Sequence, residues 1–156
     1  MYAPLQTVDH SALKVNQTGI VATVLVAFVG SIFFRPLWAL IPLLAIVLLA
    51  GTFNPRLALF KQLYFKVLKP RGIVKPRPVL DRPEPHNFAQ GLGGVFLAVS
   101  TVLLYAATPT YGVVAAATGP ALALLVAVLA FVNLAFGYCL GCQIYFQLGK
   151  RGLIRA

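Results

Sequence analysis

The chain has 156 residues, of which 60% are hydrophobic and 10% are charged, and its formal net charge is +10. A soluble domain is about half apolar and a quarter charged, so this apolar excess cannot be buried in one small core. The composition excludes an ordinary soluble domain. No nucleic-acid-binding motif accompanies the positive charge, so we expect no nucleic acid partner and interpret residues 1–156 as a single membrane domain.

Two long apolar runs predict four membrane-spanning helices. Arg35 is the only charged residue between Val15 and Asn54, and none lies between Asn87 and Gly149. Each run is long enough for two helices of about 20 residues. We expect spans near 16–34, 37–53, 89–108 and 119–141, with TPTYG at residues 108–112 as a turn. Residues 111–118 form either a short re-entrant cap or an extension of the fourth helix. The first span is expected to stay in the mature protein.

Positive charges gather between the second and third spans and after the fourth. Eight Lys and Arg residues lie in the central segment and three in the C-terminal tail, against one at the hairpin tips. The positive-inside rule predicts that both termini and the central segment face the cytoplasm. From Arg56 an amphipathic helix is predicted to lie in the interface; partner binding is the alternative. The residues expected to contact anionic lipid are Arg56, Lys61, Lys66, Lys69, Arg71, Lys150 and Arg151. The proline-rich residues 69–86 are interpreted as an extended linker.

The two halves of the chain resemble each other. The stretch QLYFKVLKPRGIVK from Gln62 aligns with QIYFQLGKRGLIR from Gln143 once Pro70 is omitted. Polar residues also recur at the helix entries: Asp9 and Gln17 in the first half, Asp81 and Gln90 in the second. We infer two copies of one unit, about 9–75 and 81–155, each a hairpin followed by a basic segment. Because each copy has an even number of spans, the copies should run parallel across the membrane.

The stretch YCLGCQIY holds the only two cysteines of the chain, Cys139 and Cys142. A pair with this spacing can cycle between dithiol and disulfide and can pass electrons or sulfur. The fourth span is expected to reach residue 141, which puts the pair at a helix C-terminal end, where the dipole disfavours the thiolate. Cys142 is expected to lie nearer water and to attack, with Cys139 as the resolving thiol.

Other interpretations of the cysteine pair stay open. Both thiols could pack as small apolar residues in a non-catalytic subunit or scaffold of a larger membrane complex. His10 and His86 could complete a metal site with the cysteines, but two thiols are too few for a closed site and nothing fixes the distances. We therefore expect no metal and no other cofactor. A small-solute carrier is disfavoured because the spans contain no polar pathway.

Two motifs resemble an uncharacterised bacterial integral-membrane family known only as a domain of unknown function. They are DRPEPHNFAQGLGGVF from Asp81 and NLAFGYCLGCQIY from Asn133. The resemblance covers nearly the whole chain and implies a four-helix protein of the bacterial inner membrane, loosely associated with thioredoxin-like and sulfur-transfer proteins. We therefore expect an all-α membrane protein of two tandem parallel hairpins, alone, as a homo-oligomer or in a larger complex. Its cytoplasmic dithiol would exchange electrons or sulfur with a soluble thioredoxin-like partner.

Overall fold

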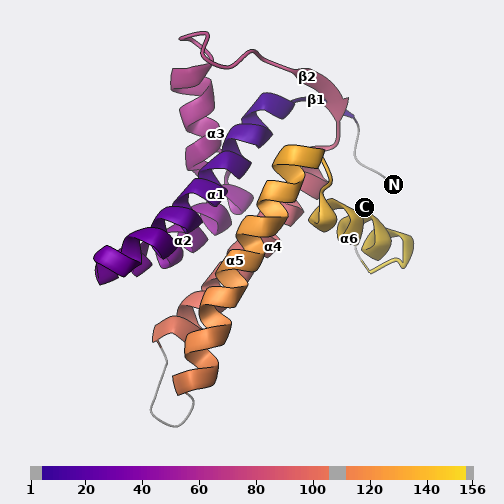
Figure 1. The fold of residues 1–156 in the computed structure, drawn as a ribbon. Coiled ribbons are helices and arrows are strands. Elements are labelled where there is room, and N and C mark those ends of the chain that lie inside the picture. The colour runs from indigo at the N-terminus through magenta and orange to yellow at the C-terminus, as the bar shows by residue number, and fades with distance from the viewer. Residues whose placement is uncertain (1–4, 106–111, 154–156) are drawn as a thin grey trace.

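The computed structural model describes residues 5–105 and 112–153. Long helices make up most of this structure, and one short two-stranded sheet lies at one end (Figure 1). In chain order the elements are β1 (Gln6–Asp9), α1 (His10–Phe33), the 3-10 helix η1 (Arg35–Ala39), α2 (Leu40–Phe53), the 3-10 helix η2 (Pro55–Leu57), α3 (Leu59–Leu63), the π-helix η3 (Tyr64–Leu68), β2 (Pro78–Asp81), α4 (Pro83–Tyr105), α5 (Gly112–Phe136) and α6 (Leu140–Lys150).

Within the described residues, four helical segments are long and apolar enough to cross a membrane. They are His10–Phe33, Arg35–Phe53, Pro83–Tyr105 and Gly112–Phe136. The segments agree with the expected all-α membrane protein, although the first and third begin about one and a half turns earlier than predicted. Asp9 caps the first of them, and Pro83 starts the third, where proline suits the first helical turn. The predicted turn at residues 108–111 lies outside the described residues.

The fourth long helix differs from the prediction at both ends. Residues 112–118 extend α5, which continues through Pro120, so the re-entrant cap is wrong. The helix then ends at Phe136, because Gly137 adopts a φ of 70° and donates its N–H to the Asn133 carbonyl at 2.9 Å. A glycine in this left-handed conformation commonly ends a helix. The cysteine motif is therefore outside the fourth span.

The interior of the bundle is built from apolar residues of all four long helices. Its fully buried members include Val24, Ala27, Ile41, Leu48, Leu97 and Ala123. Small residues lie where helices approach most closely: a Cβ added at Gly94 would come within 2.8 Å of Leu49. Lipid supplies no hydrophobic force between helices, so close packing of small residues has to hold them together. Large side chains such as Phe33 and Phe53 point outward, with 86% and 87% of their surface exposed.

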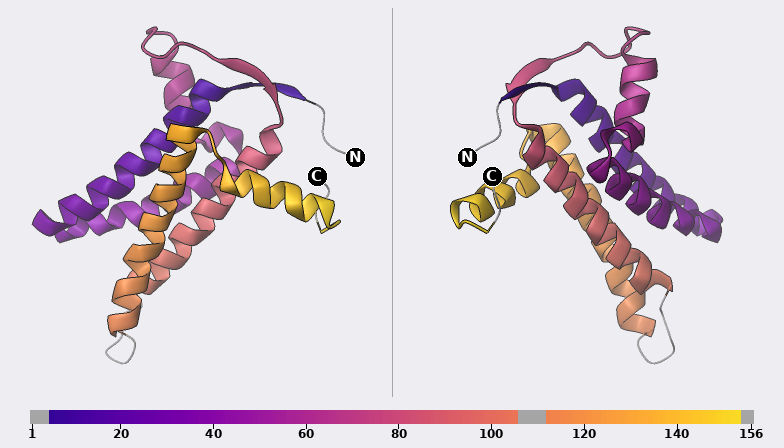
Figure 2. Two further views of the ribbon diagram at one scale, coloured as in Figure 1. Left: turned by 45° about the vertical axis from the view of Figure 1, so that its right-hand side comes forward. Right: turned by 180° about the vertical axis from the view of Figure 1, so that it is seen from behind.

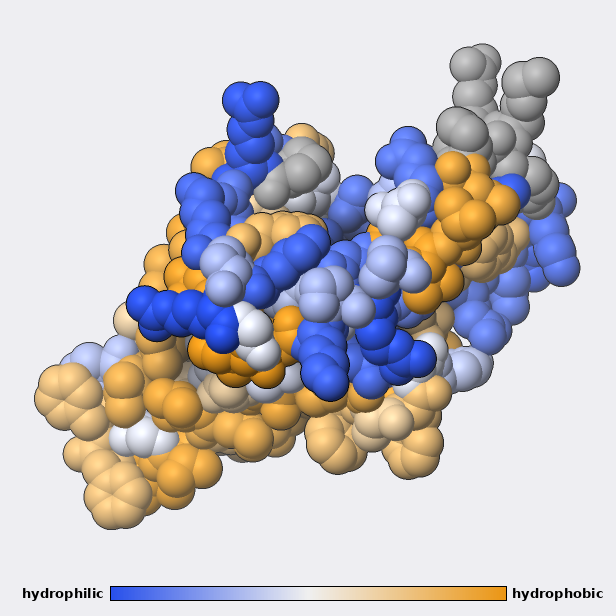
Figure 3. Space-filling view, turned by 90° about the horizontal axis from the view of Figure 1, so that it is seen from above, coloured by the Kyte–Doolittle hydropathy of each residue, from blue (hydrophilic) through white to orange (hydrophobic). Residues whose placement is uncertain are grey.

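The sheet joins the entries of the two hairpins. β1 and β2 pair antiparallel, with Gln6 opposite Asp81 and Asp9 opposite Pro78. Residues 78–81 of the predicted linker therefore form a strand and residues 83–86 begin α4, and the sheet brings the N-terminal ends of α1 and α4 together (Figure 2). The elements α3 and α6 lie at the same end of the molecule (Figure 1). Viewed from this end, hydrophilic residues cover the surface and hydrophobic residues continue along the helices (Figure 3).

Asp9 fastens the start of α1 to two other segments. Its Oδ1 accepts the backbone N–H groups of Ser11 and Arg77, each at 3.1 Å, and its Oδ2 accepts the buried Tyr64 hydroxyl at 2.8 Å. Lys69 Nζ lies 3.8 Å from the same carboxylate. Burial alone would raise the pKa of Asp9, but the hydrogen bonds from Tyr64, Arg77 and Ser11 and the charge of Lys69 together lower it.

Replacing Asp9 is expected to destabilise the sheet end. Asp9→Ala removes the helix cap and should lower the free energy of unfolding by about 1–2 kcal/mol, while Asp9→Asn keeps a capping oxygen and should lose less. The pKa of Asp9 in the folded protein lies below the ordinary value of 3.8. The native protein should therefore be more stable than Asp9→Asn by the full difference in unfolding free energy above pH 3.8. This difference should disappear as the pH falls through the folded pKa. Thermal unfolding in detergent across the acid range measures this. Equal stability of Asp9→Ala and the native protein at neutral pH would contradict it.

Candidate functional site

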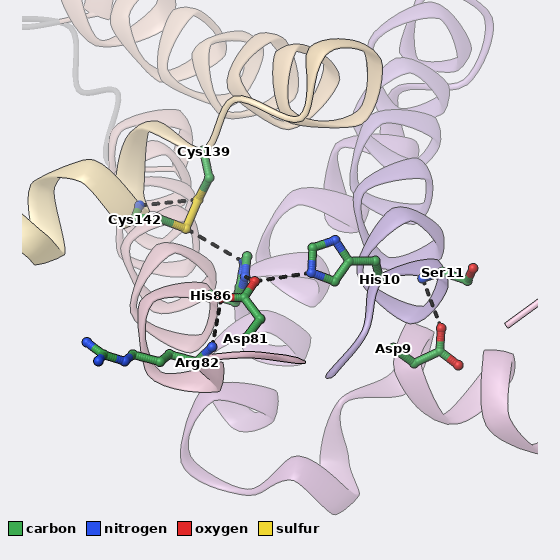
Figure 4. Close-up of polar contacts among 8 residues, drawn as sticks. All are labelled: Asp9, His10, Ser11, Asp81, Arg82, His86, Cys139 and Cys142. Carbon is green, nitrogen blue, oxygen red and sulfur yellow. Dashed lines mark hydrogen bonds and ion pairs between the residues drawn. A yellow bond between two sulfur atoms is a disulfide. The ribbon is translucent and has the colours of Figure 1, made fainter. Parts of the chain in front are cut away.

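Cys139 and Cys142 form a disulfide at the start of α6, with their Cα atoms 5.2 Å apart (Figure 4). Cys139 is the N-cap residue of this helix, and its Sγ accepts the backbone N–H of Cys142 at 3.2 Å. The prediction that the pair lies at a helix C-terminal end is wrong, because Gly137 ends α5 before the motif and a new helix starts at Leu140. A helix N-terminus lowers the pKa of a nearby thiol, so the dipole favours the thiolate here.

The two cysteines differ in exposure. Cys142 is 8% exposed, whereas Cys139 is half-buried. Cys142, which was expected to be the attacking thiol, is therefore the more buried of the two residues. The physical reason is the close contact between α6 and α4: a Cβ added at Gly141 would lie 2.5 Å from the Ala89 Cβ, so the first turn of α6 is pressed onto α4. Cys139, at the entry of α6, is the less buried residue of the pair.

His86 and Asp81 extend the site from the buried sulfur (Figure 4). The Nδ1 atom of His86 lies 3.6 Å from Cys142 Sγ, and its Nε2 atom lies 3.0 Å from Asp81 Oδ2. His10 Nε2 approaches the same carboxylate oxygen at 3.1 Å. A neutral His86 that donates from Nε2 to the carboxylate presents its Nδ1 lone pair to the sulfur. The order thiol, imidazole, carboxylate is that of a nucleophile activated by an oriented base.

The carboxylate of Asp81 is held in its charged form. Burial alone would raise its pKa, but the hydrogen bond from His86, the backbone N–H of Arg82, the charge of His86 and the hydrogen bond from His10 together lower it. An ionised Asp81 orients the His86 ring by accepting a hydrogen bond from its Nε2 atom.

The same atoms offer two ligand sets for a metal ion. Donor atoms of His86, Cys139 and Cys142 lie within 4.8 Å of one another, and so do those of His10, Asp81 and His86. Two thiolates and an imidazole would supply three of the four ligands of a tetrahedral zinc ion. These thiolates exist only in the reduced protein, so metal binding would compete with the disulfide. Of the two histidines considered as possible metal ligands, His86 lies near the cysteines and His10 contacts Asp81.

Two hollows meet at the disulfide. A groove of about 460 Å³ runs over its polar side, from His10 and Asp81 past both cysteines to Lys150. A second hollow of about 90 Å³ lies inside the bundle, is lined mostly by apolar residues and also reaches His86 and Cys139. Neither hollow is predicted from the sequence.

The other predicted site residues fall into two groups. Gln17 and Gln90 line the inner hollow, and Gln90 donates from Nε2 to the Leu48 carbonyl at 3.1 Å. Lys61 is partly buried and donates to Asn87 Oδ1 at 3.2 Å, and burial lowers its pKa, so it faces α4 rather than the outer surface. The remaining basic residues predicted to contact lipid are exposed: Arg56, Lys66, Lys69, Arg71, Lys150 and Arg151.

The fold and the site define a helical protein with four membrane-length segments and a cysteine pair closed as a disulfide at one end. A family model described as "Domain of unknown function (DUF4395)" matches residues 8–150. The chain belongs to this family, which confirms the predicted membership of an uncharacterised domain family. No curated protein and no solved structure matches it.

The contact between Gly141 and Ala89 can be tested directly. Gly141→Val is expected to push α6 away from α4, lower the free energy of unfolding by about 1–3 kcal/mol and raise the fraction of free thiols. Gly112→Val is a matched control, because a Cβ added there meets no atom within 4 Å. Thermal unfolding in detergent and thiol titration measure the two effects. A Gly141→Val protein as stable and as fully oxidised as the control would show that the contact does not hold the site.

Proposed function

We propose that this protein exchanges electrons between its Cys139–Cys142 pair and a soluble thioredoxin-like partner at the membrane surface. The observation that carries the proposal is the placement of the pair: an accessible Cys139 at a helix N-cap, and a buried Cys142 against His86 and Asp81. A cysteine that only filled space would need neither the N-cap position nor an oriented base.

The exchange proceeds through a mixed disulfide. A thiolate of the reduced partner attacks Cys139 Sγ, a new S–S bond forms, and the bond to Cys142 breaks. Cys142 leaves as a thiolate and takes the proton that the second partner thiol releases, relayed through Nδ1 of His86, which Asp81 holds in place. The second partner thiolate then attacks the partner's own sulfur and releases Cys139. Two electrons and two protons pass to the pair, the partner becomes a disulfide, and the reverse sequence reduces the partner.

We place the site on the cytoplasmic face of the bacterial inner membrane. The sheet end carries the eight basic residues of the central segment, whereas the hairpin tips carry only Arg35. This distribution supports cytoplasmic termini by the positive-inside rule, and the exposed basic residues suit anionic lipid. Disulfides in the cytoplasm are usually transient and catalytic, which agrees with a pair that cycles.

We also propose that the chain is a tandem duplication whose two hairpins run parallel. The order of elements supports this: β1, α1, α2 and α3 with η3 in the first half, and β2, α4, α5 and α6 in the second. In this view α6 is the counterpart of the basic segment after the first hairpin, and the second copy alone acquired cysteines.

The proposed orientation predicts opposite accessibility at the two ends of the molecule. In a protein with both native cysteines replaced by Ser, Lys75→Cys should react with a membrane-impermeant maleimide only in inside-out vesicles. Arg35→Cys should react only in right-side-out vesicles, because a hairpin tip emerges on the other face. Both native residues are exposed in the structure. Labelling of the two positions from the same side would contradict the four-span orientation.

The roles of the two thiols predict which variant traps a partner. Cys142→Ser should accumulate a mixed disulfide through Cys139 with a thioredoxin that lacks its own resolving cysteine and whose remaining thiol carries a thionitrobenzoate disulfide, because the Cys139 thiolate attacks the thioredoxin sulfur and releases thionitrobenzoate. Cys139→Ser, with only the buried thiol left, should give about tenfold less adduct, which corresponds to about 1.4 kcal/mol in the activation free energy for reaching the buried sulfur. Adduct is measured by non-reducing electrophoresis of the full-length protein in detergent. Equal amounts from both variants would contradict the assigned roles, and no adduct from either would favour a non-catalytic subunit.

A further inference from the structure

The disulfide borders the inner hollow as well as the groove. The inner hollow lies between α1, α4 and α5 and the start of α6, and its volume is about 90 Å³. Most of its wall is apolar, and its polar groups are His86, Cys139 and four uncharged amides: Asn16, Gln17, Gln90 and Asn133. Cys139 lines both this hollow and the groove. A molecule dissolved in the bilayer could therefore meet the same sulfur that a soluble partner meets from outside.

Gln90 brings a buried acceptor without a partner to the wall of this hollow. The residue is 7% exposed, and its Oε1 atom has no hydrogen-bond partner in the part of the chain that the structure describes. Its Nε2 atom is used by the Leu48 carbonyl. A buried acceptor without a partner costs free energy, so native structures rarely keep one unless a ligand or water satisfies it. A ligand with a hydroxyl group on an apolar frame would satisfy this acceptor.

We propose that the hollow binds the head group of a lipid-soluble quinone, which oxidises the Cys139–Cys142 dithiol. This inference rests on the proposed function and names the second reactant of the same site. A quinone takes two electrons and two protons, as many as a dithiol releases. Its ring is apolar and its oxygens lie at opposite edges, which suits an apolar wall with a few amides. In its reduced form it carries the hydroxyl groups that Gln90 Oε1 would accept.

The reaction balances without a further oxidant. The Cys139 thiolate adds to a ring carbon of the quinone, forming a C–S bond. Cys142, deprotonated by His86, attacks Cys139 Sγ, so the S–S bond forms and the C–S bond breaks. The electron pair of the broken bond stays on the ring. The two thiol protons pass to the two oxygens, one of them through His86, and a hydroquinone leaves. Electrons would thus pass from the soluble dithiol, through this pair, to the bilayer.

Gly93 allows the hollow to be filled without touching the thiol chemistry. It lines the hollow, and a Cβ added there would meet Val126 at 3.7 Å and Leu48 at 3.9 Å, which are ordinary contacts. Gly93→Leu should therefore fold while placing side-chain atoms where the ring would lie. Gly112→Leu adds the same side chain in open space at the far end of α5 and is the matched control. Gln90→Met keeps the length of the side chain and removes its amide oxygen.

The experiment mixes chemically reduced full-length protein with decylubiquinone, without oxygen, and follows quinone reduction and thiol loss. The native protein should lose two thiols per quinone reduced, at a rate that saturates with quinone concentration. Gly93→Leu should lower the rate at subsaturating quinone by about tenfold. Gln90→Met should raise the quinone concentration that gives half of the maximal rate. Gly112→Leu should match the native protein. Thermal unfolding confirms that each variant is folded. A Cys139→Ser, Cys142→Ser protein measures the background.

A parallel experiment that mixes the disulfide form of the protein with reduced thioredoxin separates this inference from the proposed function. Exchange with thioredoxin but no quinone reduction above background would overturn the quinone site and leave the proposed function standing. Quinone reduction without thioredoxin exchange would support the quinone site and reject the thioredoxin-like partner. A rate that does not saturate, or a folded Gly93→Leu protein as fast as the native one, would also overturn the quinone site.

Discussion

The carboxylate of Asp81 accepts contacts from the rings of His86 and His10 at 3.0 and 3.1 Å, and the geometry of the cysteine site depends on it. Asp81 ends β2, His10 begins α1, and His86 lies in the first turns of α4. One anion thus ties three chain segments, and His86 carries its influence to Cys142 on a fourth. Removing the charge would remove the acceptor of both rings. The position of His86 and the contact between β2 and the start of α1 therefore depend on the same carboxylate.

The long helices and the ionisable groups of the site occupy different parts of the structure. The long helices meet through apolar and small residues, which suit a lipid solvent and do no chemistry. The ionisable groups of the site come from strand ends and helix entries at one end, where backbone N–H groups are free to bind acceptors. Asp9 and Cys139 both occupy N-cap positions, one with a carboxylate oxygen and one with a sulfur as the acceptor. The same kind of helix cap thus occurs in both halves of the chain.

The sequence predicted the spans well, because freedom from charge over a bilayer-length run is a property of consecutive residues. It placed the cysteines on the wrong helix end, because the apolar run continues past Phe136 and only the backbone angle of Gly137 ends α5 there. This glycine, two residues before a cysteine, was the available signal. The contact of His86 with Cys142 could not be predicted, since it depends on the packing of Gly141 against Ala89, which leaves no local pattern.

The pairing of β1 with β2 has a consequence for how the molecule is assembled. His10 and Asp81 are 71 residues apart in the chain, and His86 and Cys142 are 56 apart. Contacts this distant form late, because the intervening chain must be ordered first. During synthesis the first hairpin is complete before Asp81 leaves the ribosome, and the cysteines follow only after the second. Cys142 therefore cannot contact His86 until the residues of both hairpins have been made.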